Sequence, residues 1–151
     1  QINIDYPSKE EEQEILYRTT GILEQKVEKV VSKEEILELQ NFVRKVPISE
    51  HVVEYIIDIV RATRPTNSYS PEFIKKYVQW GCSPRAEQTI VIAAKVNALL
   101  NSHTAVSIDD VNEIIFPALR HRIILNFQAI AEGIKSDFII SELLEHFSQR
   151  K

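Results

Sequence analysis

The chain has 151 residues, of which 26% are charged and 44% hydrophobic, with a formal net charge of −4. This composition fits one folded domain with an attached arm and excludes a disordered chain. The negative net charge disfavours a broad nucleic-acid-binding surface, which needs an excess of basic residues.

A single cysteine, Cys82, excludes an intramolecular disulfide and a multi-cysteine zinc site. It favours a reducing, cytoplasmic setting. No apolar run reaches the ~20 residues of a membrane-spanning helix, so we expect no membrane insertion. The chain begins at Gln1 and contains no methionine, which fits either a piece of a longer protein or proteolytic processing.

Apolar and polar residues alternate over residues 2–5, which predicts a strand that Pro7 ends. No second strand follows nearby, and a lone strand has no partners for its backbone hydrogen bonds. We therefore predict that residues 1–7 are the tail of a sheet whose other strands lie upstream.

Ser8 and Glu11 have the spacing of a capping box and predict a helix to about Arg18. Ile15 and Leu16 are expected to face inward. Residues 22–31 have no clear period and fit either an extended connection or a weak helix; we favour a connection.

Two amphipathic helices are predicted between residues 32 and 63. Ser32 opens the first with a second capping box, and Pro47 ends it. Ser49 can cap the second, which ends near Thr63 because the residue before Pro65 is pushed out of the helical region. Their apolar residues recur at helical spacing: Ile36, Leu39, Val43, Val46, Val52, Val53, Ile56, Ile57 and Val60.

A short helix is expected after a polar loop. Ser70 and Pro71 give an N-cap and a first helical residue, and the helix runs to Gly81. Gly81 suits the left-handed residue that follows a helix end. Trp80 is expected to pack beside this turn.

Residues 81–85 then open the next helix, with Ser83 as N-cap and Pro84 at the first helical position. Arg85 becomes the second residue of the helix, at the positive end of its macrodipole. A guanidinium there can meet an anion such as phosphate, or it can pair with a nearby carboxylate. The sequence around it leaves both readings open.

The helix from Pro84 to about Leu100 carries only Glu87 and Lys95 as charged residues after Arg85. Apolar residues cover nearly its whole circumference, so we predict that it is the buried central helix. Arg85 would stand at its exposed tip.

The remaining chain reads as a turn and two more helices. Ser107 caps the first, in which Pro117 predicts a kink or an early end. Residues 124–131 fit either strand or helix, with Phe127 buried. Ser136 is expected to cap the last helix.

Three arginines have a simple structural explanation and a possible interface role. Arg64 lies at a helix C-terminus, and Arg120 and Arg122 belong to the most basic stretch of the chain. Cations at a helix C-terminus offset the macrodipole, which alone explains them. For the stretch with Arg120 and Arg122, an anion site is the alternative, and all three arginines could instead contact another domain or subunit.

No catalytic motif is present: the chain has no phosphate-binding loop and no Gly-x-Ser-x-Gly elbow. His51, His103, His121 and His146 lack metal-ligand spacing, and Cys82 reads as a packing residue. We predict no metal site and no catalytic residue in this chain.

Several stretches together resemble a known family, and they follow in order: Ala62-Thr63-Arg64-Pro65, Trp80-Gly81-Cys82-Ser83-Pro84-Arg85, Leu119-Arg120-His121-Arg122-Ile123 and Ala131-Glu132-Gly133. In this order and spacing the chain resembles the C-terminal part of MoxR-type AAA+ ATPases, relatives of the magnesium-chelatase ATPase subunit. The resemblance covers nearly the whole chain. Cys82 departs from it, since the family more often has a smaller residue there.

The resemblance implies a mainly α fold: a helical lid domain over residues 32–151, preceded by residues 1–31 as the last strand, linking helix and connection of an α/β nucleotide-binding core. Arg85 looks like the sensor-2 arginine, which reaches the γ-phosphate of ATP, with Gly81, Ser83 and Pro84 supporting its turn. The phosphate loop, the Mg²⁺-binding acidic motif and any arginine finger would lie upstream.

For the full-length protein, the resemblance implies an ATP- and Mg²⁺-dependent hydrolase that forms a homo-hexameric ring and remodels or activates client proteins. This chain alone would contact the core domain of the same protein and should neither hydrolyse ATP nor bind it tightly. The alternative is a free-standing helical interaction module without a nucleotide role. A helical DNA reader using Arg120 and Arg122 is disfavoured by the net charge.

Overall fold

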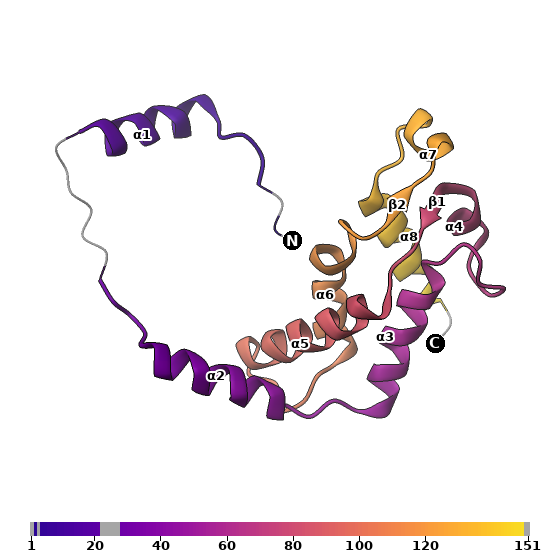
Figure 1. Cartoon of the computed structure of the whole chain (residues 1–151), viewed down its shortest axis with the longest axis horizontal. Coiled ribbons are helices and arrows are strands. Elements are labelled where there is room, and N and C mark those ends of the chain that lie inside the picture. The colour runs from indigo at the N-terminus through magenta and orange to yellow at the C-terminus, as the bar shows by residue number, and fades with distance from the viewer. Residues whose placement is uncertain (1, 3, 22–27, 150–151) are drawn as a thin grey trace.

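The computed structural model describes residues 2, 4–21 and 28–149, and Figure 1 shows their arrangement. The fold is mainly helical, as the sequence predicts. Its elements in chain order are α1 (Lys9–Thr20), α2 (Lys33–Lys45), α3 (Glu50–Ala62), α4 (Glu72–Tyr77), β1 (Val78–Trp80), α5 (Pro84–Leu100), α6 (Ile108–Leu119), β2 (Ile124–Leu125), α7 (Phe127–Ala131) and α8 (Ser136–Ser148).

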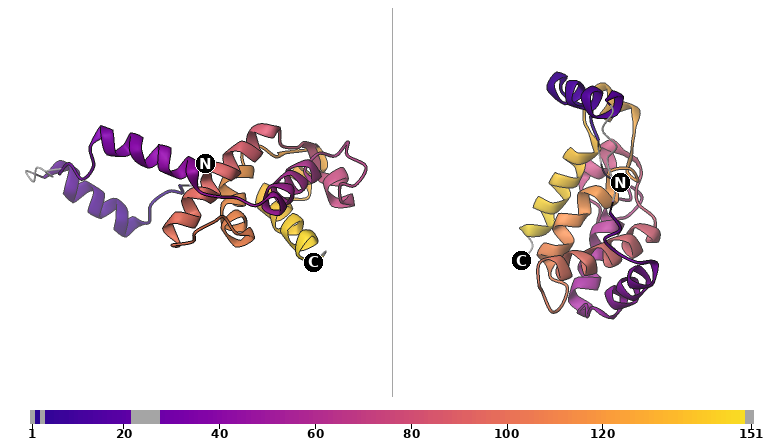
Figure 2. Two further views of the ribbon diagram at one scale, coloured as in Figure 1. Left: turned by 90° about the horizontal axis from the view of Figure 1, so that it is seen from below. Right: turned by 90° about the vertical axis from the view of Figure 1, so that its left-hand side faces the viewer.

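A helical bundle built on α3, α5, α6 and α8 contains the hydrophobic core. Helix α5 packs against α2, α3 and α6, while α8 packs on α3 and α6. The segment around α1 forms an arm that stands apart from the bundle, beyond α2 (Figures 1 and 2). The hydrophobic core of the bundle therefore contains no residue of α1.

Helix α5 is central but is not buried all round, so that prediction is wrong. The face toward the bundle consists mostly of small residues with no exposed surface: Ala86, Ile90, Ala94 and Ala98. Small side chains at four-residue spacing let α6 pack close to α5. The opposite face is open, and Leu100 at its end is 77% exposed. Residue type alone did not reveal which face of α5 is exposed, because apolar residues occupy both faces.

The arm begins with the predicted capping box. The Ser8 Oγ accepts from the Glu11 N–H at 3.3 Å, and the Glu11 carboxylate accepts from the Ser8 N–H at 2.7 Å. Ile15 and Leu16 are exposed, however, so the inward orientation predicted for them is wrong in this chain. Helix α1 has no buried residue, and it is in none of the element pairs that pack closely on each other.

The predicted N-terminal strand is absent from residues 2 and 4–7, which have no regular secondary structure. Residues 1 and 3 lie outside the described part. The predicted connection is seen only at residues 28–31, which are also irregular, while residues 22–27 lie outside the described residues. A strand needs a neighbour for its backbone hydrogen bonds, and the described arm provides none.

Helix α2 has the second predicted capping box, formed by Ser32 and Glu35. Its apolar stripe is largely exposed, but the residue after its end, Val46, is buried in the core. The Lys95 Nζ donates to the Arg44 carbonyl at 3.0 Å, which joins the end of α2 to α5. Thus α2 is attached to the bundle at its C-terminal end.

The short helix predicted to reach Gly81 ends earlier. Helix α4 stops at Tyr77, and β1 pairs antiparallel with β2, with Trp80 opposite Ile124. Ser70 is not its cap, because the Ser70 Oγ donates to the Arg64 carbonyl at 2.8 Å. Trp80 is 67% exposed, so its predicted packing is wrong. Pairing with β2, which lies far away in sequence, overrides the local helical pattern.

The ambiguous stretch over residues 124–131 contains both structures, β2 followed by α7. Asn126 caps α7 by accepting from the Ala129 N–H at 3.0 Å. This turn of the chain leaves Phe127 85% exposed, so its predicted burial is wrong. Its neighbour Ala129 occupies the inward position instead.

Two helix boundaries differ from the prediction in the C-terminal part. Pro117 lies inside α6, and the helix continues for two residues to Leu119. Lys135 rather than Ser136 is the residue before α8, and it makes no side-chain capping bond. The capping sequence at Ser107 is present as predicted.

Candidate functional site

The turn before α5 is fixed by the C-terminal end of α3. The Cys82 N–H donates to the Thr63 Oγ1 at 2.8 Å, and the Thr63 Oγ1 donates to the Val60 carbonyl at 2.6 Å. Thr63 has no exposed surface. Its hydroxyl therefore makes two buried hydrogen bonds that join the two segments.

Gly81 is needed here for a different reason than the one predicted. Its φ is not positive, so it is not a left-handed residue. A Cβ at this position would lie 2.3 Å from the Thr63 carbonyl oxygen and 2.7 Å from the Arg64 nitrogen. Only glycine allows the turn to lie directly on the backbone of residues 63 and 64.

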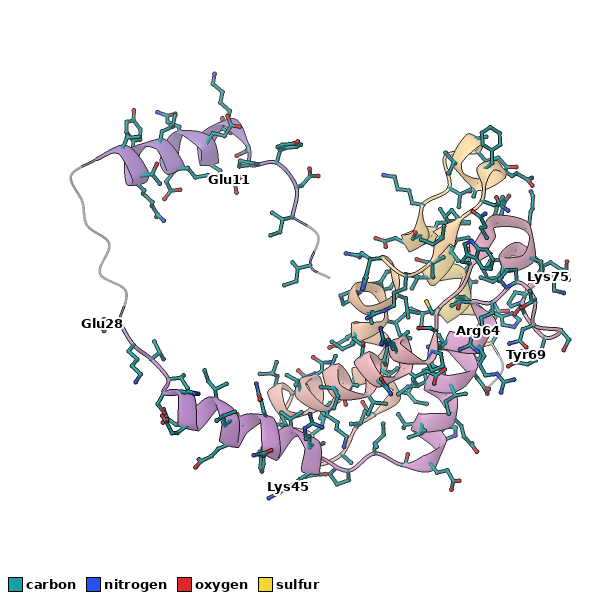
Figure 3. The ribbon with its side chains drawn as sticks, in the orientation of Figure 1. Glu11, Glu28, Lys45, Arg64, Tyr69 and Lys75 are labelled. Carbon is teal, nitrogen blue, oxygen red and sulfur yellow. The ribbon has the colours of Figure 1, made fainter. Side chains whose placement is uncertain are left out.

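Arg64 holds the other side of the same turn. It lies just beyond the C-terminal end of α3 (Figure 3), where its Nε donates to the Cys82 carbonyl at 2.8 Å. Its Nη2 lies 3.4 Å from a carboxylate oxygen of Glu87 on α5. The structure thus uses Arg64 within the bundle, as a tie between α3 and the start of α5.

Arg85 follows the fixed turn as the second residue of α5. Pro84 is the first residue, and Ser83 has an extended N-cap backbone without a side-chain capping bond. The Arg85 carbonyl accepts from the Thr89 Oγ1 at 2.8 Å, and the side chain is exposed. Within residues 2, 4–21 and 28–149, no carboxylate pairs with its guanidinium. Of the two partners considered for Arg85, a nearby carboxylate is therefore not found in the described chain.

Arg85 opens onto a shallow hollow of about 550 Å³ on one side of α5, which Arg122 also lines. The other lining residues are Gln88, Thr89, Ile92 and Ala93. Two arginines from distant parts of the sequence thus line one surface depression.

Arg120 is placed elsewhere, although it is only two residues from Arg122. Its Nε and Nη2 donate to the Asp137 carboxylate at 3.1 and 3.0 Å, which joins the end of α6 to α8. Paired in this fork geometry, Arg120 has a structural role within the bundle.

Comparison with known proteins gives this geometry a context. The AAA lid domain family matches residues 72–143, which include the turn, Arg85 and Arg122. Chaperone MoxR1 of Mycobacterium tuberculosis is 35% identical over 144 residues, covering 95% of this chain and 38% of that protein. A crystal structure of a candidate ATPase from Cytophaga hutchinsonii is 38% identical, with a TM-score of 0.83.

This chain belongs to the MoxR-type AAA+ family and carries its lid domain. The resemblance read from the sequence and the predicted lid fold are both confirmed. The uncharacterised Bacillus subtilis protein YeaC is a further relative, 32% identical over 95% of this chain and 42% of its own length. The crystal structure covers 94% of this chain and 43% of its own. The MoxR-type chain therefore spans about two fifths of the length of these relatives.

Cys82 is a packing residue in this MoxR-type lid. The side chain is buried, and burial raises the pKa of its thiol to about 11. A thiol with such a pKa stays protonated at neutral pH and is a poor nucleophile. The departure from the smaller residue of the family is accommodated in the core.

The described part of the lid holds no cluster of three or more histidine, cysteine or carboxylate side chains that could bind a metal ion. Its described helices include none that is long and apolar enough to cross a membrane.

One histidine, His103, contacts the buried carboxylate of Asp110, with 3.0 Å between Nδ1 and Oδ2.

Sequence reasoning missed two residues of the site, Thr63 and Thr89. Thr63 was read only as a helix end, although it belongs to the quoted stretch before Pro65. Thr89 connects Arg122 to Arg85, since the Arg122 Nη2 donates to its Oγ1 at 3.2 Å. The only available signal for Thr89 was its spacing, because residues four apart share one face of a helix.

Proposed function

We propose that this chain is the lid portion of an ATP-hydrolysing MoxR-like protein and that Arg85 is its sensor-2 arginine. The observation that carries the proposal is an exposed guanidinium, without a carboxylate partner in the described chain, on a turn held by buried hydrogen bonds. A residue that senses a ligand in another domain needs both properties. Its guanidinium must be available to bind the ligand, and its backbone must stay fixed when the ligand binds.

The residues of this lid fit the phosphate part of ATP. Arg85 supplies a planar, permanently charged group with several donors, which suits the γ-phosphate oxygens. The helix N-terminus behind it adds favourable electrostatics. ATP, when bound in the core domain, supplies the phosphoryl group that water attacks. Arg85 would donate hydrogen bonds to that group and stabilise its negative charge.

The described lid offers no comparable set of ligands for Mg²⁺. Hard cations need several oxygen ligands, and the described residues offer no such group of carboxylates. We assign Mg²⁺ and the catalytic motifs to the rest of the protein. Without them, this chain should neither hydrolyse ATP nor bind it tightly.

The turn gives the lid a way to respond to hydrolysis. The supporting contacts join the turn before α5 to the end of α3, so a force on the Arg85 guanidinium would act on two helices of the bundle rather than on a loop. Loss of the γ-phosphate would release the lid, and the two domains would rotate as rigid bodies. In a homo-hexameric cytoplasmic ring, such rotations would drive remodelling or activation of client proteins. The chaperone name of the mycobacterial relative supports this part of the proposal.

The proposed domain organisation follows from the same reading. Residues 32–151 would be the lid and residues 1–31 the tail of the core. Of the three arginines considered for an interface, Arg64 and Arg120 pair with carboxylates inside the bundle, which supports a structural role for both. The end of α2 is joined to α5 while no described element packs on α1, which supports a boundary between these two helices.

The decisive test is Arg85→Ala in the full-length protein. Loss of a charge-assisted hydrogen bond in the transition state should lower ATP turnover by about tenfold or more. The melting temperature should stay unchanged, because the side chain is exposed and has no described partner. Arg61→Ala is a matched control, since Arg61 is exposed and stacks on Tyr69 at 5.6 Å.

Unchanged turnover in Arg85→Ala would remove this residue from the nucleotide site. A full-length protein that bound no ATP at all would overturn the whole proposal and leave the interaction module in its place.

A further inference from the structure

Arg122 lies between α6 and β2, and its side chain reaches back to the first turns of α5. Its Nη1 donates to the Ala118 carbonyl, and its Nη2 donates to the Thr89 Oγ1 at 3.2 Å. Both acceptors are neutral. The guanidinium is therefore held in place while its charge stays uncompensated by the described residues.

This situation differs from that of two other arginines near the site. Arg64 faces Glu87 at 3.4 Å, and Arg120 faces Asp137 at 3.0 Å. Arg122 and Arg85 have no carboxylate partner in the part of the chain that the structure describes, although both line the same hollow. Two cations that share a depression repel each other unless an anion neutralises them.

The contacts also connect the two arginines mechanically. The Thr89 hydroxyl accepts from Arg122 and donates to the Arg85 carbonyl at 2.8 Å. Arg122 is thus tied to the backbone that carries Arg85. This hydrogen bond links the Arg122 guanidinium to the helix that carries Arg85.

We propose that Arg122 is a second phosphate-binding residue that contacts the triphosphate of the nucleotide beside Arg85. This inference rests on the proposed function, because it takes the anion to be a nucleotide in the core domain. Arg122 has five N–H donors, of which the two contacts above use two, so donors remain for phosphate oxygens. A polyphosphate with several negative charges is matched better by two guanidinium groups than by one.

Four substitutions in the full-length protein separate the charge of Arg122 from its contacts. Arg122→Gln keeps an N–H donor for the neutral acceptors and removes the charge. Arg122→Lys keeps the charge. Thr89→Val removes the tie between the two arginines and leaves both charges. Arg85→Ala tests the proposed function itself.

The dissociation constant of ATP is measured for each variant by calorimetry, with the melting temperature as a check on folding. Arg122→Gln should weaken ATP binding about tenfold, the size expected for one charge-assisted contact. Arg122→Lys and Thr89→Val should stay within about threefold of the wild type, because both keep a positive charge beside the triphosphate. Arg61→Ala should match the wild type.

Wild-type affinity in Arg122→Gln would overturn the inference. So would a Thr89→Val loss as large as that of Arg122→Gln, combined with no rescue by lysine, since Arg122 would then only position Arg85. If Arg122→Gln fails to fold, a tenfold loss in a folded Arg122→Lys counts against the inference. Normal binding and turnover in Arg85→Ala would instead overturn the proposed function.

Discussion

At the residue scale, the turn before Arg85 depends on a glycine that no other residue can replace. The missing Cβ of Gly81 is what lets the turn touch the backbone at Thr63. We expect Gly81→Ala to destabilise the lid by about 2–3 kcal/mol, because backbone atoms cannot move aside as a flexible side chain could. Thermal unfolding measures this, with Gly133→Ala as the matched control. Gly133 has φ +72° and open space around it, so alanine there costs only the strain of about 1 kcal/mol. Equal losses for the two variants would contradict the close contact at Gly81.

Asp110 gives the fold a dependence on acid at the same scale. Burial opposes its ionisation, but hydrogen bonds from Ser107, His103 and Asn101 outweigh burial and lower the pKa of the carboxyl from 3.8 to about 2. A carboxyl whose pKa is lower in the folded state stabilises that state above its unfolded pKa. The contribution, about 2 kcal/mol, should be lost as the pH falls from about 4 to about 2. Unfolding measured across this range should show the loss, and Asp110→Asn should flatten the curve. If the stability of the wild type did not change between these pH values, the proposed contribution of Asp110 would be disproved.

At the element scale, the same capping motif should contribute different amounts to the stability of different helices. Ser32 and Glu35 form their box on an exposed helix, while Ser107 donates to the buried Asp110 carboxylate at 2.7 Å. Ser107→Ala should cost about 2 kcal/mol, because a buried charge loses a donor. Ser32→Ala should cost about 1 kcal/mol or less, the ordinary value of a cap. Chemical denaturation of both variants provides the comparison. A larger loss at Ser32 would show that burial of the box is unimportant.

Four helix starts were predictable from sequence because capping is local, whereas the caps predicted at Ser70 and Ser136 are absent. Ser8, Ser32, Ser49 and Ser107 all cap through bonds to residues three positions ahead, which the sequence itself displays. Burial was not predictable in the same way. Whether Trp80 is covered depends on a strand pairing with Ile124, which lies far away in the chain. For the candidate site, the helix start at Pro84 could be read locally, whereas the approach of Arg122 to Thr89 requires the folded bundle.

At the scale of the whole molecule, the bundle should fold without the arm. No residue of α1 is buried and no described element packs against it, whereas Val46 after α2 belongs to the core. A chain of residues 32–151 should therefore melt within about 2 °C of the complete one, since the core that determines stability is unchanged. Calorimetry of the two chains tests the proposed domain boundary. A clear drop in melting temperature would mean that residues 1–31 stabilise the lid and that the boundary is misplaced.

The open face of α5 has a mechanical consequence for the whole lid. The helix has 17 residues, so it is about 25 Å long and carries Arg85 at one end and the exposed Leu100 at the other. Its small buried residues hold it tightly to α6, so the helix cannot tilt alone and takes the bundle with it. A tilt of about 10° centred on Arg85 would then displace Leu100 by about 4 Å, from the helix rise alone. A rotation small enough to keep the hydrogen bonds around Arg85 would therefore produce a larger displacement at Leu100. A protein surface in contact with that end of the helix would have to move with it.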